Sequence, residues 1–356
     1  MPRVKGRRQI DKSLIHRILV RATNWVGDGV MTLPALEAVR RNFPSSSITV
    51  LAKPWVLSLF EAHPAVDHVM PFEKGEGAFT GLGEMLRIIR LIRKEKFDLA
   101  ILFQNAFEAA LLTCLGGVRL RLGYNTDSRG LLLTHGVIRD NEVLKVHQVE
   151  YYLSILRAMD WEAKGSEPSL HVRGKNREEA MGFLASEGIR DEEYLIGLGP
   201  GAIFGGSKRW PPGRFARIGE WAAERWGARI LLFGSSKERE ICEEVAREMG
   251  HTPVNFCGRT SLGEAMGLIN LCQLFVTNDS GLMHVSAALG VPTVAIFGST
   301  DPNATGPGGL RTMVVRHDVE CAPCMKPECP THHRCMLSIE PEVVWEAMAA
   351  LKGETE

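Results

Sequence analysis

Residues 16–42 read HRILVRATNWVGDGVMTLPALEAVRRN. The first seven, 16–22, contain the apolar, partly β-branched run ILV and predict a strand, and the glycines of 23–29 predict a tight turn. From about Met31 to Asn42 apolar residues recur at helical spacing, which predicts an amphipathic helix. A strand that passes through a glycine-containing turn into a helix is the repeating unit of a parallel α/β sheet.

The same unit recurs along the chain. In the first half, further strands are predicted at 47–53, 66–71 and 97–103, and helices at 85–97 and 108–115. In the second half, strands are predicted at 194–199, 229–233, 273–277 and 293–297, and helices at 212–226, 237–249 and 281–289. We therefore predict an α/β protein of two Rossmann-like, doubly wound domains, 1–175 and 176–340, that face each other across a cleft. The last helix, within 341–356, is predicted as a separate element that packs back on the first domain.

Length and composition narrow the class of protein. A chain of 356 residues agrees with about two domains. Its 42 basic and 42 acidic residues cancel, which argues against a nucleic-acid binder. We find no apolar run near the ~20 residues of a membrane-spanning helix and no apolar core of a signal peptide. Eight cysteines in a chain of this length are not a disulfide scaffold, so we expect a cytoplasmic protein.

Ligands of doubly wound sheets bind beyond the carboxyl ends of the strands, so the loops there are the first places to search. The first such loop contains Asn24, Trp25 and, between two glycines, Asp28. A carboxylate at this point has two interpretations. It caps the following helix, or it faces the cleft as a general base.

The second loop, 199–211, is glycine-rich and carries Lys208 and Arg209. Gly197, Gly199 and Ala202 formally match the G-x-G-x-x-A dinucleotide fingerprint, but no helix is predicted to begin directly after them. Two basic residues in a glycine-rich loop suit a diphosphate whose negative charge grows as a bond breaks. The alternative is a solvated basic loop.

The third loop runs from a strand into a helix at Asp279, Ser280 and Gly281, with His284 one turn further on. Free amides at a helix start favour an anion, and we expect His284 to face the same opening. A plain capped helix with a satisfied histidine is the alternative. A fourth polar loop, 298–302, follows the next predicted strand. Several such loops at one edge favour a phosphate-bearing ligand.

Four cysteines lie close together in the sequence at Cys321, Cys324, Cys329 and Cys335. This density suggests a structural zinc site, although the spacing is not that of two paired C-x-x-C motifs. The alternative is a proline-braced crossover without metal.

The helix predicted over 85–97 carries Arg87 and Arg90 beside an apolar stripe. It suits an anionic membrane surface or an acidic acceptor. The alternative is a helix that packs on the sheet and exposes its basic face to solvent.

Four segments together carry a resemblance to a known family: ILVRATNWVGDGVMTLPAL (18–36), GPGAIFGGSKRWPPGRF (199–215), TNDSGLMHVSAALGVPTVAIFGSTDP (277–302) and the cysteine segment (321–336). The chain resembles the heptosyltransferases of glycosyltransferase family 9, most of all those that add the second heptose. The resemblance extends from about residue 18 to the last helix. It implies the GT-B fold.

The resemblance also implies an activity. It implies inverting transfer of L-glycero-D-manno-heptose from ADP-heptose to the first heptose of the Kdo2-lipid A inner core, without a catalytic metal or cofactor. The implied partners are ADP-heptose, heptosyl-Kdo2-lipid A and the cytoplasmic face of the inner membrane of a Gram-negative bacterium, with no nucleic acid.

Residue roles follow from the same likeness. Asp28 corresponds to the proposed base and Lys208 to the lysine at the diphosphate, so both are expected to be catalytic. The expected donor-binding residues are Gly201, Lys208, Ser235, Glu238, Asp279, Ser280, Gly281 and His284. The expected acceptor-binding residues are Asn24, Trp25, Arg87 and Arg90.

Two alternatives remain at this point. A sister enzyme that adds the first or a later heptose has the same donor and a different acceptor. An NAD-dependent oxidoreductase is the alternative from another class, and it rests on the fingerprint at Gly197–Ala202.

Overall fold

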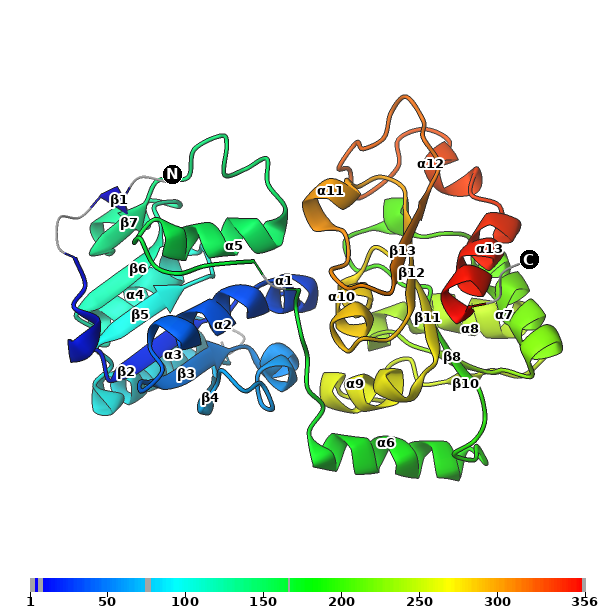
Figure 1. The fold of residues 1–356 in the computed structure, drawn as a ribbon, viewed down its shortest axis with the longest axis horizontal. Coiled ribbons are helices and arrows are strands. Elements are labelled where there is room, and N and C mark those ends of the chain that lie inside the picture. Colours follow the sequence, from blue (N-terminus) through cyan, green and yellow to red (C-terminus); the bar gives the residue numbers. More distant parts are fainter. Residues whose placement is uncertain (1–3, 6–8, 74–77, 166, 354–356) are drawn as a thin grey trace. The chain divides into compact units, whose positions relative to one another are not determined.

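The computed structural model describes residues 4–5, 9–73, 78–165 and 167–353. The chain divides into two compact units, Met1–Pro168 and Ser169–Glu356 (Figure 1). Each unit is a sheet of mostly parallel strands with helices on both faces, as predicted. Among the described residues, no helix is both long enough and apolar enough to cross a bilayer.

The first unit is built on a seven-stranded sheet in the order β1-β7-β6-β5-β2-β3-β4. Its strands are β1 Val4–Lys5, β2 Arg17–Arg21, β3 Ser47–Ala52, β4 His68–Pro71, β5 Leu99–Leu102, β6 Leu120–Tyr124 and β7 His135–Val137. All neighbours pair in parallel except β1, which pairs antiparallel with β7. Since β2 lies between β3 and β5, the strand order reverses at the carboxyl ends of β2 and β5.

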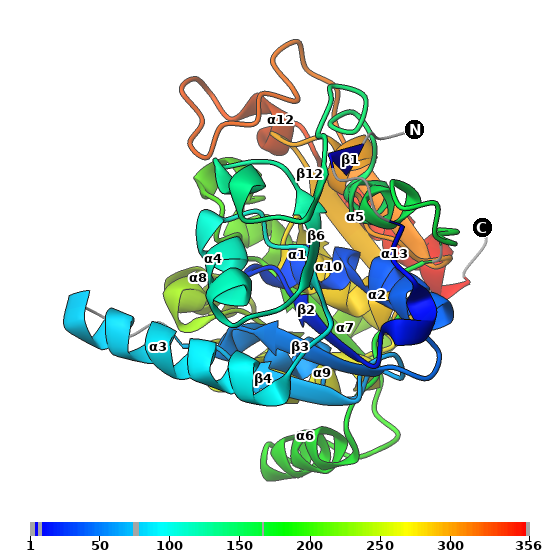
Figure 2. The same ribbon diagram turned by 90° about the vertical axis from the view of Figure 1, so that its left-hand side faces the viewer.

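Helices cover both faces of this sheet. They are α1 Val26–Met31, α2 Leu33–Asn42, α3 Ala78–Glu95, α4 Phe107–Leu115 and α5 Gln148–Arg157. Helices α1, α2 and α5 contact one another, and α3 contacts α4 (Figures 1 and 2). Ile88, Ile89 and Ile92 of α3 are buried in the core against the sheet, while the N-terminal turns of α3 project away from the strands (Figure 2).

The second unit is built on a six-stranded parallel sheet in the order β10-β9-β8-β11-β12-β13. Its strands are β8 Leu195–Gly199, β9 Arg229–Leu232, β10 Val254–Asn255, β11 Leu274–Asn278, β12 Thr293–Phe297 and β13 Thr312–Arg316. Its helices are α6 Gly174–Ser186, α7 Pro212–Trp226, α8 Arg239–Glu248, α9 Leu262–Leu271, α10 Gly281–Ala288, α11 Pro302–Thr305, α12 Arg334–Leu337 and α13 Pro341–Lys352. Here the strand order reverses between β8 and β11.

The domain boundary differs from the predicted one. The division lies between Pro168 and Ser169, whereas a boundary at 175/176 would cut the first turn of α6. Helix α6 belongs to the second unit because it packs closely on α9. A Cβ on Gly267 of α9 would lie 2.5 Å from the carbonyl oxygen of Asn176, so only glycine permits this approach.

The last helix also differs from its prediction, since α13 packs within the second unit against α7 and the sheet (Figure 1). Val344, Ala347 and Met348 are buried in the core of that unit. Trp345 stacks on Trp226 of α7 with ring centroids 4.3 Å apart. The helix therefore belongs to the second unit rather than forming a separate element.

We expect Trp345→Ala to lower the free energy of unfolding of the second unit by about 2–3 kcal/mol, because it removes this stacking and an edge contact with Trp221. Chemical denaturation followed by far-ultraviolet circular dichroism measures the change. Trp25→Ala removes an indole that is 63% exposed and is the matched control, with an expected change within about 0.5 kcal/mol. Equal effects of the two variants would show that α13 does not stabilise the sheet.

Candidate functional site

Three of the predicted site loops follow strands next to the two points of reversed strand order. The loop with Asp28 follows β2 in the first unit, and those with Lys208 and Asp279 follow β8 and β11 in the second. Helices on either side of such a point diverge and leave room for a ligand. The topology therefore places the candidate residues where open α/β sheets bind ligands.

Asp28 lies in the first turn of α1. Trp25 holds the N-cap position and makes no capping hydrogen bond through its side chain, so the interpretation of Asp28 as the N-cap residue is wrong. The positive end of the helix dipole favours the ionised carboxylate at this place. The next position, 29, favours glycine because a Cβ there would lie only 2.7 Å from Leu59 Cδ1.

Tyr152 of α5 is buried, and its phenol interacts electrostatically with the charge of Asp28. The pKa of Tyr152 is raised well above its ordinary value. Burial is the largest cause, and the negative charge of Asp28 is the second. The phenol therefore stays protonated at neutral pH.

Arg21 orders the loop after β2. Its guanidinium is buried and donates to Asn24 Oδ1 at 2.9 Å and to the carbonyl oxygen of Ala22 at 2.5 Å. Burial lowers the pKa of Arg21 to about 10, and Glu108 opposes that shift, so Arg21 remains charged at neutral pH. Trp55 Nε1 donates to the carbonyl oxygen of Asn24 at 2.8 Å. Asn24 is thus held in place.

Arg87 and Arg90 lie on the exposed side of α3, and Arg87 Nε pairs with Glu84 of the same helix at 2.7 Å. The opposite face is the apolar one that packs on the sheet. The helix therefore matches the sheet-packing interpretation with a solvated basic face. An acceptor role for these two arginines stays a prediction.

In the second unit, the buried carboxylate of Asp279 contacts side chains from two other loops, those of Lys208 and Thr300. Asp279 is 5% exposed, and its Oδ2 atom lies 2.6 Å from Lys208 Nζ and accepts a hydrogen bond from Thr300 Oγ1 at 2.6 Å. Lys208 Nζ also lies 4.7 Å from the centre of the Phe204 ring. The predicted pair of Lys208 and Asp279, 71 residues apart, is thus brought into direct contact.

Asn278, which precedes Asp279, fixes the glycine-rich loop to β11. Its Oδ1 atom accepts the Trp210 amide at 3.0 Å, and its Nδ2 atom donates to the carbonyl oxygen of Pro200 at 2.7 Å. One buried side chain therefore holds both ends of the loop that carries Lys208.

A second carboxylate, that of Glu238, lies in the 3₁₀ turn Ser236–Glu238 after β9. Glu238 Oε2 accepts hydrogen bonds from the amide and the hydroxyl of Ser235, at 2.8 and 2.7 Å. Gly201 lies directly against Glu238, since a Cβ on Gly201 would be 2.2 Å from Glu238 Oε1. The structure thus brings the predicted residues Gly201, Ser235 and Glu238 together.

At the start of α10, Ser280 holds the N-cap position but makes no capping hydrogen bond through its side chain. Its hydroxyl lies 3.2 Å from Thr277 Oγ1, so the first amides of the helix, at Gly281 and beyond, are left to other acceptors. His284 is buried, at 5% exposure, as are its neighbours Met283 and Val285. Its predicted place at the donor site stays a prediction.

The dinucleotide fingerprint has a packing explanation. A Cβ on Gly197 would lie 2.4 Å from the Phe275 ring, and one on Gly199 would lie 2.7 Å from Thr277 Oγ1. After β8 the next α-helix begins only at Pro212, so no helix terminus faces a pyrophosphate directly after these glycines. This geometry removes the basis of the oxidoreductase alternative.

The cysteine segment folds against the Lys208 loop. All eight cysteines of the chain are free thiols. Within the part of the chain that the structure describes, no group of three or more His, Cys, Asp or Glu side chains is placed to hold a metal ion. The Met325 amide of this segment donates to the carbonyl oxygen of Ser299 at 2.8 Å.

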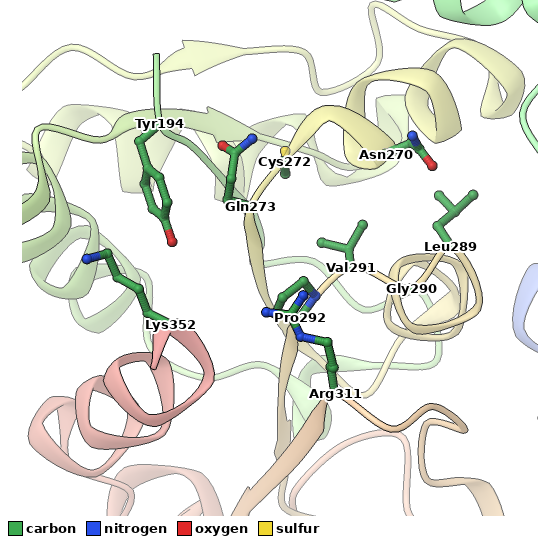
Figure 3. A pocket seen from close by; sticks show the side chains of 10 residues that line it. All are labelled: Tyr194, Asn270, Cys272, Gln273, Leu289, Gly290, Val291, Pro292, Arg311 and Lys352. Carbon is green, nitrogen blue, oxygen red and sulfur yellow. The ribbon is translucent and has the colours of Figure 1, made fainter. Parts of the chain in front are cut away.

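A cavity of about 590 Å³ lies at the opposite edge of the second sheet (Figure 3). Tyr194, Gln273, Pro292 and Arg311, which line it, directly precede β8, β11, β12 and β13. It therefore faces the amino ends of the strands, and none of the predicted site residues lines it.

Sequence reasoning missed several residues of this site. Thr300 lies in the fourth polar loop, which the sequence singled out, but its bond to Asp279 spans 21 residues and has no local signal. Asn278 stands beside a predicted residue, and its role needs the positions of two distant backbone groups.

Comparison with known proteins agrees with this geometry. The model of glycosyltransferase family 9 (heptosyltransferase) matches residues 85–334. Lipopolysaccharide heptosyltransferase 2 of Salmonella typhimurium is 30% identical over 347 residues, covering 95% of this chain and 99% of that protein. Lipooligosaccharide heptosyltransferase 2 of Haemophilus influenzae is 31% identical over 346 residues, covering 94% and 99%.

The fold has a solved counterpart in the ADP-heptose lipopolysaccharide heptosyltransferase II of Escherichia coli. That structure superimposes with a TM-score of 0.82 at 29% identity, covering 95% of this chain and 100% of that one. The likeness confirms the predicted GT-B fold class of two Rossmann-like domains in one chain.

Proposed function

This chain belongs to glycosyltransferase family 9, the heptosyltransferase family, and we propose that it transfers L-glycero-D-manno-heptose from ADP-heptose to the first heptose of the Kdo2-lipid A inner core. The observation that carries the proposal is the contact of Lys208 with the buried Asp279 at the reversal point of the second sheet. The full-length similarity to enzymes named heptosyltransferase 2 supports the choice of donor and acceptor.

On the donor side, Lys208 faces the diphosphate. When the bond between the anomeric carbon and the diphosphate oxygen breaks, ADP leaves with the electron pair, and the ammonium group offsets the charge that develops. Asp279 holds Lys208 at 2.6 Å in this structure and is proposed to hold the heptose hydroxyls when the donor is bound. The start of α10 supplies amides for the phosphates.

The nucleoside half of the donor is proposed to bind beside Glu238, which lies directly against Gly201. Glu238 is buried and fixed by Ser235, so its free oxygen, Oε1, can accept hydrogen bonds from a ribose. The absence of a side chain at Gly201 allows the Glu238 carboxylate to lie directly against this loop.

On the acceptor side, Asp28 is proposed to take the proton from the acceptor hydroxyl as its oxygen attacks the anomeric carbon. This single displacement inverts the anomeric centre. It requires the loop after β2 and the loop after β8 to share one cleft, which domain closure supplies in the proposal.

We expect Gly201→Ala to weaken ADP binding at least tenfold, because the new methyl group must displace Glu238 from its two hydrogen bonds with Ser235. Isothermal titration with ADP measures the change. Gly182→Ala is the matched control, since a Cβ at Gly182 of α6 meets nothing within 4 Å. Unchanged ADP affinity in Gly201→Ala would place the nucleoside elsewhere.

The acceptor is tested by ADP release from ADP-heptose. Turnover is expected with Kdo2-lipid A that carries one heptose and not with Kdo2-lipid A that carries none. The opposite preference would assign the chain to the sister enzymes that add the first heptose. Donor binding without ADP release on either acceptor would overturn the proposed activity.

We further propose that α3 touches the cytoplasmic face of the inner membrane, where a lipid-linked acceptor is held. Leu82 and Leu86 are 51% and 42% exposed, and with Arg90 they lie on one side of the helix at spacings of four residues. Exposed leucines beside cations suit an anionic bilayer surface.

We expect Leu82→Ser/Leu86→Ser to lower co-sedimentation with phosphatidylglycerol vesicles at least threefold, because two apolar side chains no longer enter the interface. Transfer to a short, soluble acceptor is expected to stay unchanged. Ser substitution of Leu131, which is 98% exposed outside α3, is the control. Equal sedimentation of all three proteins would argue against α3 as the membrane contact.

A further inference from the structure

Ser207, the residue before Lys208, is enclosed by the segment 321–335, more than a hundred positions further along the chain. Only 1% of Ser207 is exposed. Its amide donates to the carbonyl oxygen of Pro327 at 3.0 Å, and its hydroxyl donates to that of Lys326 at 2.5 Å. Ser207 is therefore held by backbone groups of this segment and has no exposed group to offer a substrate.

The direction of the next hydrogen bond follows from this one. A carbonyl oxygen can only accept a hydrogen bond, so the Ser207 hydroxyl is the donor in its hydrogen bond with the Lys326 carbonyl oxygen. Ser299 Oγ lies 2.9 Å from Ser207 Oγ and must then be the donor. The carbonyl oxygen of Ser299 in turn accepts a hydrogen bond from the Met325 amide. The segment therefore forms hydrogen bonds with both serines.

His333 closes the cluster. Its Nε2 atom lies 2.9 Å from the carbonyl oxygen of Ser207, so Nε2 carries a proton. The backbone of His333 is in the left-handed region, with φ of 52°, which a residue with a β-carbon adopts only when its surroundings impose it. Its amide donates to Cys329 Sγ at 3.2 Å.

The backbone approach is as close as glycine allows. A Cβ on Gly205 would lie 2.1 Å from the carbonyl oxygen of Pro327. The Gly206 amide donates to Glu328 Oε1 at 3.1 Å. Residues 206–208 form a single 3₁₀ turn. Hydrogen bonds that hold its first two residues therefore also fix the backbone of the third, Lys208.

We propose that Ser207, Ser299 and His333 are positioning residues, through which the segment 321–335 holds Lys208 at the diphosphate of the donor. This inference rests on the proposed function. A lysine side chain has four rotatable bonds, so its charge acts on a fixed point only when its backbone and its ammonium group are both held. Asp279 holds the ammonium group, and the segment holds the backbone.

The test is a double-mutant cycle on the Kd for ADP, measured by isothermal titration with the full chain. We expect Ser207→Ala to raise the Kd about tenfold and Lys208→Met to raise it at least as much. In the Lys208→Met background, Ser207→Ala is expected to add less than about twofold, because no ammonium group remains to be positioned. An equal effect of Ser207→Ala in both backgrounds would mean that the contact only supports the fold.

His333 provides a second arm that stays informative if Ser207→Ala does not fold. His333→Gln retains an N–H donor near the Nε2 position, whereas His333→Phe retains a ring without a donor. We expect Gln to keep the Kd for ADP within about threefold of wild type and Phe to raise it about tenfold, at equal melting temperatures. Equal Kd values for Gln and Phe would overturn the positioning role. An unchanged Kd in Lys208→Met alone would instead contradict the proposed donor site.

Discussion

Replacement of Asp28 with asparagine is expected to lower kcat for heptose transfer by about 10²–10⁴-fold, the usual contribution of a general base. The amide has nearly the shape of the carboxylate and cannot take the acceptor proton. The Kd for ADP-heptose is expected to stay within about twofold of wild type, because the proposed donor residues all lie in the second unit. Steady-state ADP release and isothermal titration with ADP-heptose measure the two quantities.

Glu142→Gln is the matched control for a carboxylate-to-amide change in the same unit. Its side chain is 80% exposed and pairs with Lys145 on the surface, so kcat is expected to stay unchanged. Comparable turnover in Asp28→Asn and in wild type would remove Asp28 as the base. A parallel loss of donor binding would assign Asp28 to the donor or to the fold instead.

Tyr152 is the titratable group beside Asp28 that competes for the same role. Because burial and the charge of Asp28 raise its pKa, the phenol is protonated at the pH of the assay and cannot accept a proton. Tyr152→Phe is therefore expected to retain most of the transfer activity. A loss as large as that of Asp28→Asn would transfer the base role to Tyr152.

The sequence predicts strands β2 to β5, β8, β9, β11 and β12 because their signals are local. These strands are largely apolar, and glycines mark the loops that carry Asp28 and Lys208. Strands β6, β7 and β13 are not predicted. The edges are predicted less well. Strands β1 and β10 have two residues each, and the helix after β2 begins at Val26 rather than near Met31, since glycines weaken the helical pattern without preventing the helix.

The candidate site shows the same division between local and distant signals. Gly201 and Glu238 are predicted only through resemblance, and the contact that explains the glycine joins residues from two loops. His284 is buried together with all of residues 283–288 of α10, so its burial depends on how this helix packs in the fold. The hydrogen bond between Ser207 and Lys326 joins residues 119 positions apart, so no sequence pattern near Ser207 predicts it.

Lys208→Met is expected to cause the other large loss, in rate and in affinity together. It removes the cation that faces the departing diphosphate, so we expect kcat to fall about 10²–10³-fold. A charge-assisted hydrogen bond of about 1.5–3 kcal/mol corresponds to a roughly 10–100-fold rise in the Kd for ADP. Stopped-flow or steady-state ADP release gives the first value, and isothermal titration gives the second.

The control for Lys208→Met must separate lost chemistry from damage to the site. Among the described residues, the substitution leaves the buried carboxylate of Asp279 with Thr300 as its remaining side-chain partner. Lys208→Met/Asp279→Asn removes that unpaired charge. If the unpaired charge alone caused the loss, the double variant would regain ADP affinity. If the diphosphate contact is lost, as we expect, affinity stays low in both. Lys175→Met, at a side chain that is 76% exposed on α6, should change neither value. Unchanged kinetics in Lys208→Met would place Lys208 outside the diphosphate site.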